Sequence, residues 1–264
     1  MKITLLVDQQ EHEFLQSEFG LSLLLETASG TWLFDCGSHS ALIENMQKLA
    51  LAPDMCRNVI LSHGHYDHTG GLQLLNPDKI WCTENITAPH YSFHSFSDIH
   101  NISMVPEAVE VLKKSDVHFV RKFELAMPDF FLTGPIPRNS FEDPGGKFFH
   151  DQTCTQADCV SEEQSLLTLD GILISGCCHA GIINTLQYCR KQAPEIHVHT
   201  IVGGLHLRSA SAERLNKTAD FLREYGVKKL YLLHCTGSNA IEQLRKLLPE
   251  CFIYSPTLGE TFCC

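Results

Sequence analysis

The stretch SHGHYDHTGG, residues 62–71, places three histidines and one aspartate within six positions. It follows the apolar run NVIL at residues 58–61, which is typical of a buried strand, and its glycines favour a tight turn. We therefore expect the cluster to lie on a loop at the C-terminal end of a strand. Because zinc and related divalent ions accept imidazole nitrogens and carboxylate oxygens as ligands, the stretch predicts a metal site.

The spacing within this cluster favours two ions. His63 and His65 lie two positions apart on an extended or turning backbone, so their imidazoles can converge on a first ion. Asp67 and His68 are adjacent and differently directed, so they can serve a second ion. Two metals about 3.5 to 4 Å apart hold a hydroxide and lower the pKa of the parent water towards neutrality, which gives a nucleophile at pH 7.

Composition and charge narrow the classes of partner. The chain has 264 residues and a formal net charge of −11, and its basic residues are scattered. A nucleic-acid partner is disfavoured because it usually needs clustered lysines and arginines. No stretch approaches the roughly 20 apolar residues that span a bilayer, and the first residues do not resemble a signal peptide. We therefore expect a cytoplasmic protein that acts on a small molecule, away from membranes, and leave a homo-oligomer open.

The chain contains 12 cysteines, which is many for its length. In a reducing compartment we expect mostly free thiols rather than disulfides. Cys154 with Cys159, the pair at 177–178 and the pair at 263–264 could hold another metal or cluster. None of them has the repeated Cys-x-x-Cys spacing that would make this case strong.

Two halves of the chain share one order of expected elements: strand, turn, strand, polar loop, helix, strand and histidine-bearing loop. The pattern predicts two βαβ-containing halves packed face to face, with an insertion at about residues 84–162 covering the site mouth and a flap at 139–164. In the first half we expect strands at 21–26 and 31–34 and a helix at 40–51. In the second we expect strands at 165–169, 172–175, 198–202 and 229–233 and helices at 182–191 and 212–225; the insertion adds strands near 117–123 and 129–132.

Three further histidines, His179, His206 and His234, each stand just past an apolar run that we expect to form a strand. The C-terminal ends of strands are where α/β folds place their sites. We therefore expect these three side chains near the cluster at 62–71.

These residues resemble a known family. HGHYDH at 63–68 matches the His-x-His-x-Asp-His signature of the metallo-β-lactamase superfamily, and LFDCG at 33–37 and TGG at 69–71 match its flanks. A branch of metal-dependent hydrolases, which includes proteins named for dihydropterin ribofuranosylaminobenzene 5′-phosphate synthase activity, is similar at GCCHAGIIN (176–184), GGLHL (203–207) and HCTG (234–237). The resemblance spans nearly the whole chain.

The resemblance implies an α/β (α+β) fold, a four-layer αββα sandwich of two mixed sheets with outer helices, here as one domain over residues 1–264. It also implies a dinuclear site. His63 and His65 would hold the first metal, and Asp67, His68 and His234 the second.

The sequence departs from the superfamily pattern at two places. The superfamily has a third ligand histidine midway, but LTGPIPR at 132–138 contains none, and it has a bridging aspartate at a strand end where this chain has Gly176 and Cys177. We assign His179 as the replacement ligand. Cys177 is either a thiolate ligand or a buried structural cysteine, and we favour the latter. Asp35 is expected to orient a ligand histidine or the loop from outside the ligand set.

Catalytic roles follow from this resemblance. Asp67 would orient the hydroxide, and His206 could be a ligand, a proton donor or an oxyanion contact, of which we favour a role without ligation. Backbone N–H groups at the helix start at 181–184 would suit an anionic group such as phosphate. Arg138 could approach from the flap, although a surface position is favoured.

We therefore predict a metal-dependent hydrolase that uses a metal-bound hydroxide on a small anionic substrate, phosphorylated or otherwise. Zn²⁺ is the expected cofactor, one or two per chain, with Mn²⁺ or Fe²⁺ as alternatives. Two other classes stay open: an iron-dependent oxidoreductase at the same residues, and a metal-binding sensor without turnover.

Overall fold

The computed structural model describes residues 1–95 and 97–263 and contains two seven-stranded sheets. The first has the strand order β18-β1-β2-β3-β4-β5-β8, and the second has the order β17-β16-β15-β14-β13-β10-β9. The strands of the first sheet are β1 (Lys2–Val7), β2 (Ser22–Thr27), β3 (Gly30–Phe34), β4 (Asn58–Ile60), β5 (Lys79–Cys82), β8 (Asp116–Phe119) and β18 (Thr261–Cys263). Those of the second are β9 (Glu124–Met127), β10 (Phe130–Leu132), β13 (Leu166–Thr168), β14 (Ile172–Ser175), β15 (Thr200–Gly203), β16 (Lys229–Leu232) and β17 (Phe252–Tyr254).

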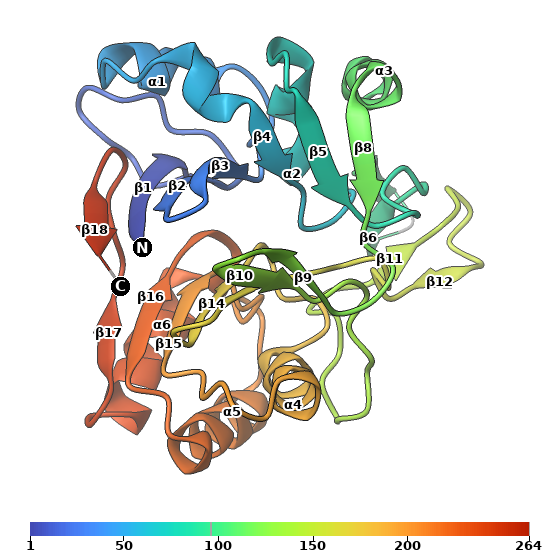
Figure 1. Ribbon diagram of the computed structural model, residues 1–264. Coiled ribbons are helices and arrows are strands. Elements are labelled where there is room, and N and C mark those ends of the chain that lie inside the picture. Colours follow the sequence, from blue (N-terminus) through green and yellow to red (C-terminus); the bar gives the residue numbers. More distant parts are fainter. Residues whose placement is uncertain (96, 264) are drawn as a thin grey trace.

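The two sheets stack face to face and helices cover their outer faces, which gives four layers (Figure 1). The helices beside the first sheet are α1 (Ala41–Lys48) and α3 (Pro106–Lys114), and those beside the second are α4 (Ile182–Gln192), α5 (Ala212–Tyr225) and α6 (Ser238–Leu247). Shorter helical turns are η1 (Pro53–Cys56), α2 (Tyr66–Thr69), η2 (Gly70–Leu74) and η3 (His234–Thr236). The predicted αββα sandwich is therefore confirmed.

Buried apolar side chains hold the layers together in three clusters. One fills the space between the sheets and includes Phe34, Phe130 and Ile174. The other two lie beneath the helices of each outer layer, around Leu42 and around Leu186. Strands β14 and β15 are buried along their whole length and β4 is buried after Asn58, and most of their residues are apolar, as is usual for parallel strands with both faces covered.

Most expected elements are found, with shifted ends. The helix predicted at 212–225 is α5 itself, whereas that predicted at 40–51 ends at Lys48 because Ala50 takes a left-handed conformation with φ 54°. The strand predicted at 117–123 ends at Phe119, opposite Cys82, where its partner β5 also ends.

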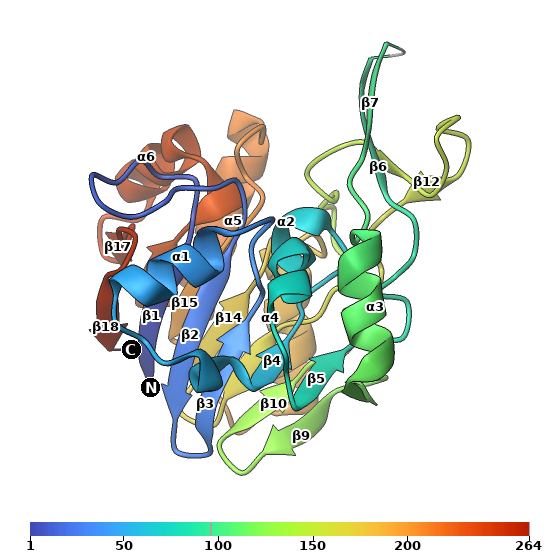
Figure 2. The same cartoon turned by 90° about the horizontal axis from the view of Figure 1, so that it is seen from above.

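The central segment contributes to three sheets. β8 extends the first main sheet, β9 and β10 extend the second, and the expected insertion at about 84–162 therefore includes strands of both. A separate four-stranded sheet consists of β6 (Tyr91–Ser95), β7 (Asp98–Asn101), β11 (Phe148–Phe149) and β12 (Ala157–Asp158). Its β6–β7 hairpin projects away from the sandwich (Figure 2). Within the described ranges, no helix has the length and apolar character needed to cross a membrane.

The parallel strands of both sheets direct their C-terminal ends to one edge of the sandwich. In the first sheet β3, β4 and β5 are parallel, and in the second β14, β15 and β16 are parallel. The loops that follow β4, β14, β15 and β16 carry all of the histidines singled out in the sequence. The fold thus brings together residues that lie more than a hundred positions apart.

Candidate metal centre

Seven buried side chains meet where these loops converge. They are the six predicted ligands, His63, His65, Asp67, His68, His179 and His234, together with Cys177. The first four come from the loop after β4 and from α2, and the other three come from the second sheet, after β14 and in η3. Both halves of the sandwich therefore contribute to the site.

One group contains His63, His65 and His179, whose ligand-type nitrogens lie within 4.8 Å of one another. The Nε2 atom of each is buried and has no hydrogen-bond partner. His179 Nδ1 lies 2.8 Å from the carbonyl oxygen of Pro144, which can only accept, so Nδ1 carries the proton and Nε2 keeps its lone pair. Burial and neighbouring imidazoles hold the pKa of all three far below the ordinary value, so the rings are neutral. Buried lone pairs that converge in this way fit a divalent cation.

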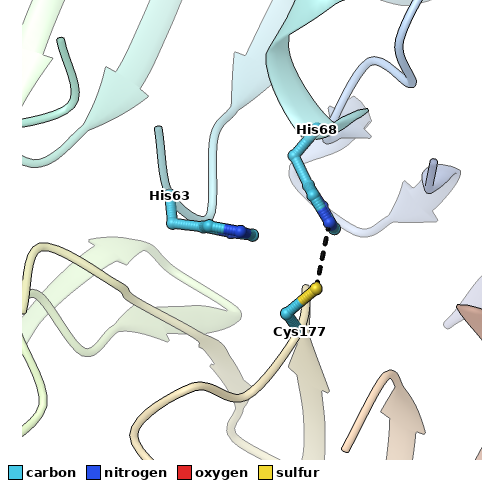
Figure 3. Close-up of side chains that lie close together, drawn as sticks. All are labelled: His63, His68 and Cys177. Carbon is cyan, nitrogen blue, oxygen red and sulfur yellow. Dashed lines mark hydrogen bonds between the residues drawn. The ribbon is translucent and has the colours of Figure 1, made fainter. Parts of the chain in front are cut away.

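The second group contains Asp67, His68, Cys177 and His234. Asp67 Oδ2 lies 3.2 Å from His234 Nε2 and 3.6 Å from His68 Nε2, while Cys177 Sγ lies 3.1 Å from His68 Nε2. Figure 3 shows the Cys177 sulfur directed at His68, with the ring of His63 beside them. Since His63, His68 and Cys177 also lie within 4.8 Å of one another, the sulfur stands between the two groups. Cys177 is at the strand end where the resemblance led us to expect a bridging aspartate.

Asp35 orients the loop that carries the cluster. Its buried carboxylate accepts hydrogen bonds from the backbone N–H and the hydroxyl of Ser62 and lies against His68 Nδ1, each at 2.7 Å. Burial by itself would lower the pKa of His68, but the carboxylates of Asp67 and Asp35 raise it to about 9. With Nδ1 held by Asp35, the Nε2 atom of His68 faces the site.

Two further residues, Asp8 and Gln9, hold His234 in place. The backbone N–H of His234 donates to Asp8 Oδ2 at 2.9 Å, and His234 Nδ1 lies 2.9 Å from Gln9 Oε1. Sequence reasoning missed both residues. The signal that could have found them is that Asp8, like Asp35, directly follows an apolar strand.

His206 lies beside the first group and is mostly but not fully buried. Its ring centroid is 4.4 Å from that of His179, and its backbone takes a left-handed conformation with φ 45°. Burial, followed by the nearby His234, lowers the pKa of His206 to about 4, so its imidazole is neutral at pH 7 without metal. The ring therefore offers a nitrogen lone pair and one N–H at neutral pH rather than a positive charge.

The expected phosphate site at residues 181–184 is occupied by the protein itself. Glu142 Oε2 accepts the backbone N–H of Asn184 at 3.0 Å, and a Cβ atom added at Gly181 would lie 2.2 Å from the Glu142 carboxyl carbon. The prediction that this helix start binds an anionic substrate group is therefore wrong, since a carboxylate from residue 142 already caps the helix. Arg138 likewise points inward, and its guanidinium donates to the carbonyl oxygens of His179 and Val160.

A second buried ionic cluster adjoins the site and was not anticipated. His90 is fully buried, with Nδ1 2.5 Å from Asp158 Oδ2 and Nε2 3.1 Å from Glu162 Oε1. Burial disfavours its charged form, but Asp158 and Glu162 raise the pKa of His90 to about 9. Its ring centroid lies 5.0 Å from that of His65, so this imidazolium packs against a histidine of the candidate metal site.

A cavity of about 1060 Å³ adjoins the predicted metal ligands. Asp67, Cys177 and His234 line it, with the aromatic rings of Phe19 and Phe148 on its walls. Phe19 lies against His234 with ring centroids 5.2 Å apart, and Phe148 lies against His65 at 5.5 Å. The exposed cations Lys147 and Arg208 also line this cavity.

Comparison with known proteins bears on the family. An uncharacterized protein of Methanocaldococcus jannaschii is 28% identical over 247 residues, which cover 93% of this chain and 94% of that protein. The protein of the same organism named 7,8-dihydropterin-6-methyl-4-(beta-D-ribofuranosyl)-aminobenzene-5'-phosphate synthase is 29% identical over 255 residues, covering 89% of this chain and 87% of that one. The crystal structure of Tm1679, a metal-dependent hydrolase of the β-lactamase superfamily, superposes with a TM-score of 0.86 at 28% identity and covers 100% of this chain and 99% of that one.

These similarities agree with the branch that the sequence motifs resemble. The profile of the metallo-beta-lactamase superfamily matches residues 17–232. The matched range includes the loop after β4, Cys177 and His179. Since the match covers most of the chain, this protein belongs to the metallo-beta-lactamase superfamily.

Proposed function

We propose that the protein is a metal-dependent hydrolase with a dinuclear, zinc-type centre. The observation that carries this proposal is the convergence of three neutral, buried imidazoles, each with an unpartnered Nε2 atom, from His63, His65 and His179. A buried polar atom without a partner costs free energy, so three of them at one point favour a ligand that accepts their lone pairs.

The first metal would be held by these three histidines, and the second by Asp67, His68 and His234. Cys177 would join the second set as a thiolate, because its sulfur lies 3.1 Å from His68 Nε2 and within reach of both groups. Burial raises the pKa of the Cys177 thiol far above its ordinary value, so a cation is needed to stabilise its thiolate form. A soft sulfur ligand favours zinc over manganese.

When bound, the metal would supply an activated water as nucleophile and stabilise negative charge on the substrate oxygen. Asp67, held against His234, would orient the nucleophile by accepting a hydrogen bond from it. His206 stands beside His179 with Nδ1 unpartnered, so it would hold a proton near the leaving group.

The substrate would be a small anionic molecule. Arg208 and Lys147 line the cavity, and neither forms an ion pair with a carboxylate in the part of the chain that the structure describes. Arg208 Nη2 has only the carbonyl oxygen of His234, at 3.4 Å, as a hydrogen-bond partner there. A phosphate or carboxylate next to the second metal position would pair with this guanidinium.

The testing experiment is elemental analysis of protein purified without added metal, with a screen of phosphodiesters, phosphomonoesters, lactones and thioesters in the same preparation. We expect about two zinc ions per chain and turnover of an anionic member, both lost in His63→Ala. His197→Ala, a change at an exposed histidine that precedes β15 and does not line the cavity, is the control and should keep both. Iron with redox activity, or bound metal without turnover of any substrate, would overturn the hydrolase proposal in favour of an oxidoreductase or a sensor.

A further inference from the structure

A segment of chain crosses the site between β10 and β11 and touches two of its histidines. We call residues 139–147 the strap. The carbonyl oxygen of Pro144 accepts the hydrogen bond from His179 Nδ1 at 2.8 Å. The next residue, Gly145, packs on His206, and a Cβ atom added there would lie 2.3 Å from His206 Nδ1. The strap therefore lies in direct contact with both rings.

The hydrogen bond to Pro144 decides how His179 presents itself. It fixes the proton on Nδ1 and leaves Nε2 as the lone-pair nitrogen that meets His63 and His65. A carbonyl partner of this kind orients a ligand imidazole and is part of what sets metal affinity. A shift of the Pro144 carbonyl would therefore change the orientation of His179 and with it the affinity for a metal.

One arginine of the outer layer holds the strap at this point. Arg214, in the first turn of α5, donates through Nη1 to the carboxylate of Asp143 and through Nη2 to its carbonyl oxygen at 3.1 Å. The side chain of Arg214 is only 9% exposed, whereas that of Asp143 is 69% exposed. Packing therefore fixes the guanidinium, and the hold on the strap rests on the geometry of its two hydrogen bonds more than on the solvent-screened charge attraction. Asp143 Oδ1 also accepts the backbone N–H of Gly145 at 2.8 Å. The guanidinium of Arg214 therefore binds both the side chain and the backbone of Asp143, which directly precedes Pro144.

The other end of the strap is fixed independently. The backbone N–H groups of Asn139 and Ser140 donate to Asn184 Oδ1 at 2.8 and 2.7 Å, and Glu142 caps α4. Loss of the Arg214 contact would therefore loosen the Pro144–Gly145 peptide without releasing the whole segment. Outside the site, this peptide would keep the hydrogen bond that Ser209 Oγ donates to the Gly145 carbonyl oxygen at 3.2 Å.

We propose that Asp143 and Arg214 form a positioning pair for the metal centre: through the strap they hold His179 in its ligating orientation and His206 against the cavity. This inference rests on the proposed function, because it assigns His179 to a bound metal. Neither Asp143 nor Arg214 contacts the histidine nitrogens that face the site, so both act through Pro144 and Gly145.

The test measures Zn²⁺ affinity of the metal-free protein by competition with a chromophoric chelator. Arg214→Gln and Asp143→Asn should each weaken Zn²⁺ binding by about 10-fold, the low end of the range for loss of a direct partner of a ligand histidine, because they loosen the Pro144 carbonyl without removing it. The double variant should lose no more than Arg214→Gln alone, because that change already removes both contacts between the guanidinium and Asp143. Arg57→Gln, which breaks the exposed ion pair with Asp78, is the matched control and should leave affinity unchanged.

A second variant keeps the proposal testable if the Arg214 changes impair folding. In Gly145→Ala the added methyl group clashes with His206, and alanine disfavours the φ of 84° that Gly145 adopts. The strap should therefore shift, and Zn²⁺ binding should weaken as much as in Asp143→Asn. Affinities within twofold of wild type in folded Asp143→Asn and Gly145→Ala proteins would overturn the positioning role. If wild-type protein binds Zn²⁺ and His63→Ala does not, unchanged affinity in the strap variants counts against the positioning role and leaves the proposed function standing. If wild type fails to bind Zn²⁺, the proposed function fails instead.

Discussion

The buried ionic cluster around His90 should make stability depend on pH in a defined way. In the folded metal-free protein, Asp158 and Glu162 raise the pKa of His90 from the ordinary 6.5 to about 9. A raised pKa means that the folded state binds the proton more tightly than the unfolded chain. The resulting stabilisation is complete below pH 6.5 and is lost as the pH rises through 9. Each pKa unit is worth about 1.4 kcal/mol, so the contribution is about 3 kcal/mol.

The variant His90→Gln tests this contribution, because the titrating groups outside the cluster are common to both proteins. Removing one partner of a buried ion pair costs about 3 to 5 kcal/mol, so we expect a loss of that size at pH 6. At pH 9.5 the wild-type protein has lost most of the benefit, and the difference between the two proteins should shrink by about 3 kcal/mol. His100→Gln breaks an exposed pair with Asp98 and should cost under about 1 kcal/mol at either pH.

The assay is urea unfolding of both variants and wild type at the two pH values, with chelator present. The reasoning would be refuted if the destabilisation by His90→Gln were equal at pH 6 and pH 9.5. That result would mean that the imidazole is neutral between the two carboxylates, which would then share the proton themselves.

Three further changes test the arrangement of the site. Asp35→Asn weakens the hold on His68 and should reduce Zn²⁺ affinity by about 10- to 100-fold in chelator competition; unchanged affinity would remove the orienting role. Cys177→Ser should abolish the sulfur-to-metal absorption band of the Co²⁺-substituted protein, whereas Cys178→Ser should retain it; a band of unchanged intensity in the first variant would exclude Cys177 as a ligand. Glu142→Ala removes the carboxylate that caps α4 and should cost about 1 kcal/mol in urea unfolding, and no loss would show that water satisfies the freed N–H groups.

The fold was readable from the sequence because its halves repeat the same local signals. A hairpin with a turn at Gly30 precedes the helix of the first half, and one with a turn at Gly171 precedes that of the second. Apolar runs such as those of β4 and β15 predict strands without reference to the rest of the chain. Element ends were less predictable, because they depend on where a partner strand stops, as with β8.

The candidate site was readable where its residues are neighbours in sequence, or where they stand just past an expected strand, as His179 and His234 do. His63 to His68 occupy one loop, so their grouping needs no knowledge of the fold. Contacts that cross the sandwich leave no such trace: Asp143 and Arg214 are 71 positions apart, and His90 and Asp158 are 68 apart. The cap of α4 by Glu142 lies 42 positions away in sequence, which is why the helix start was expected to be free.

If the proposed ligands bind a metal, their division between the two sheets would make that metal a cross-link between the halves of the sandwich. The loop after β4 supplies four side chains from one half, and the segments after β14 and β16 supply the others. Binding energy is then available only when the halves are docked, and saturation at a hundred times Kd adds about 2.7 kcal/mol to that docked state. Because each half supplies only part of the proposed ligand set, a substitution that disturbs the packing of one sheet should also lower the metal affinity of the residues in the other.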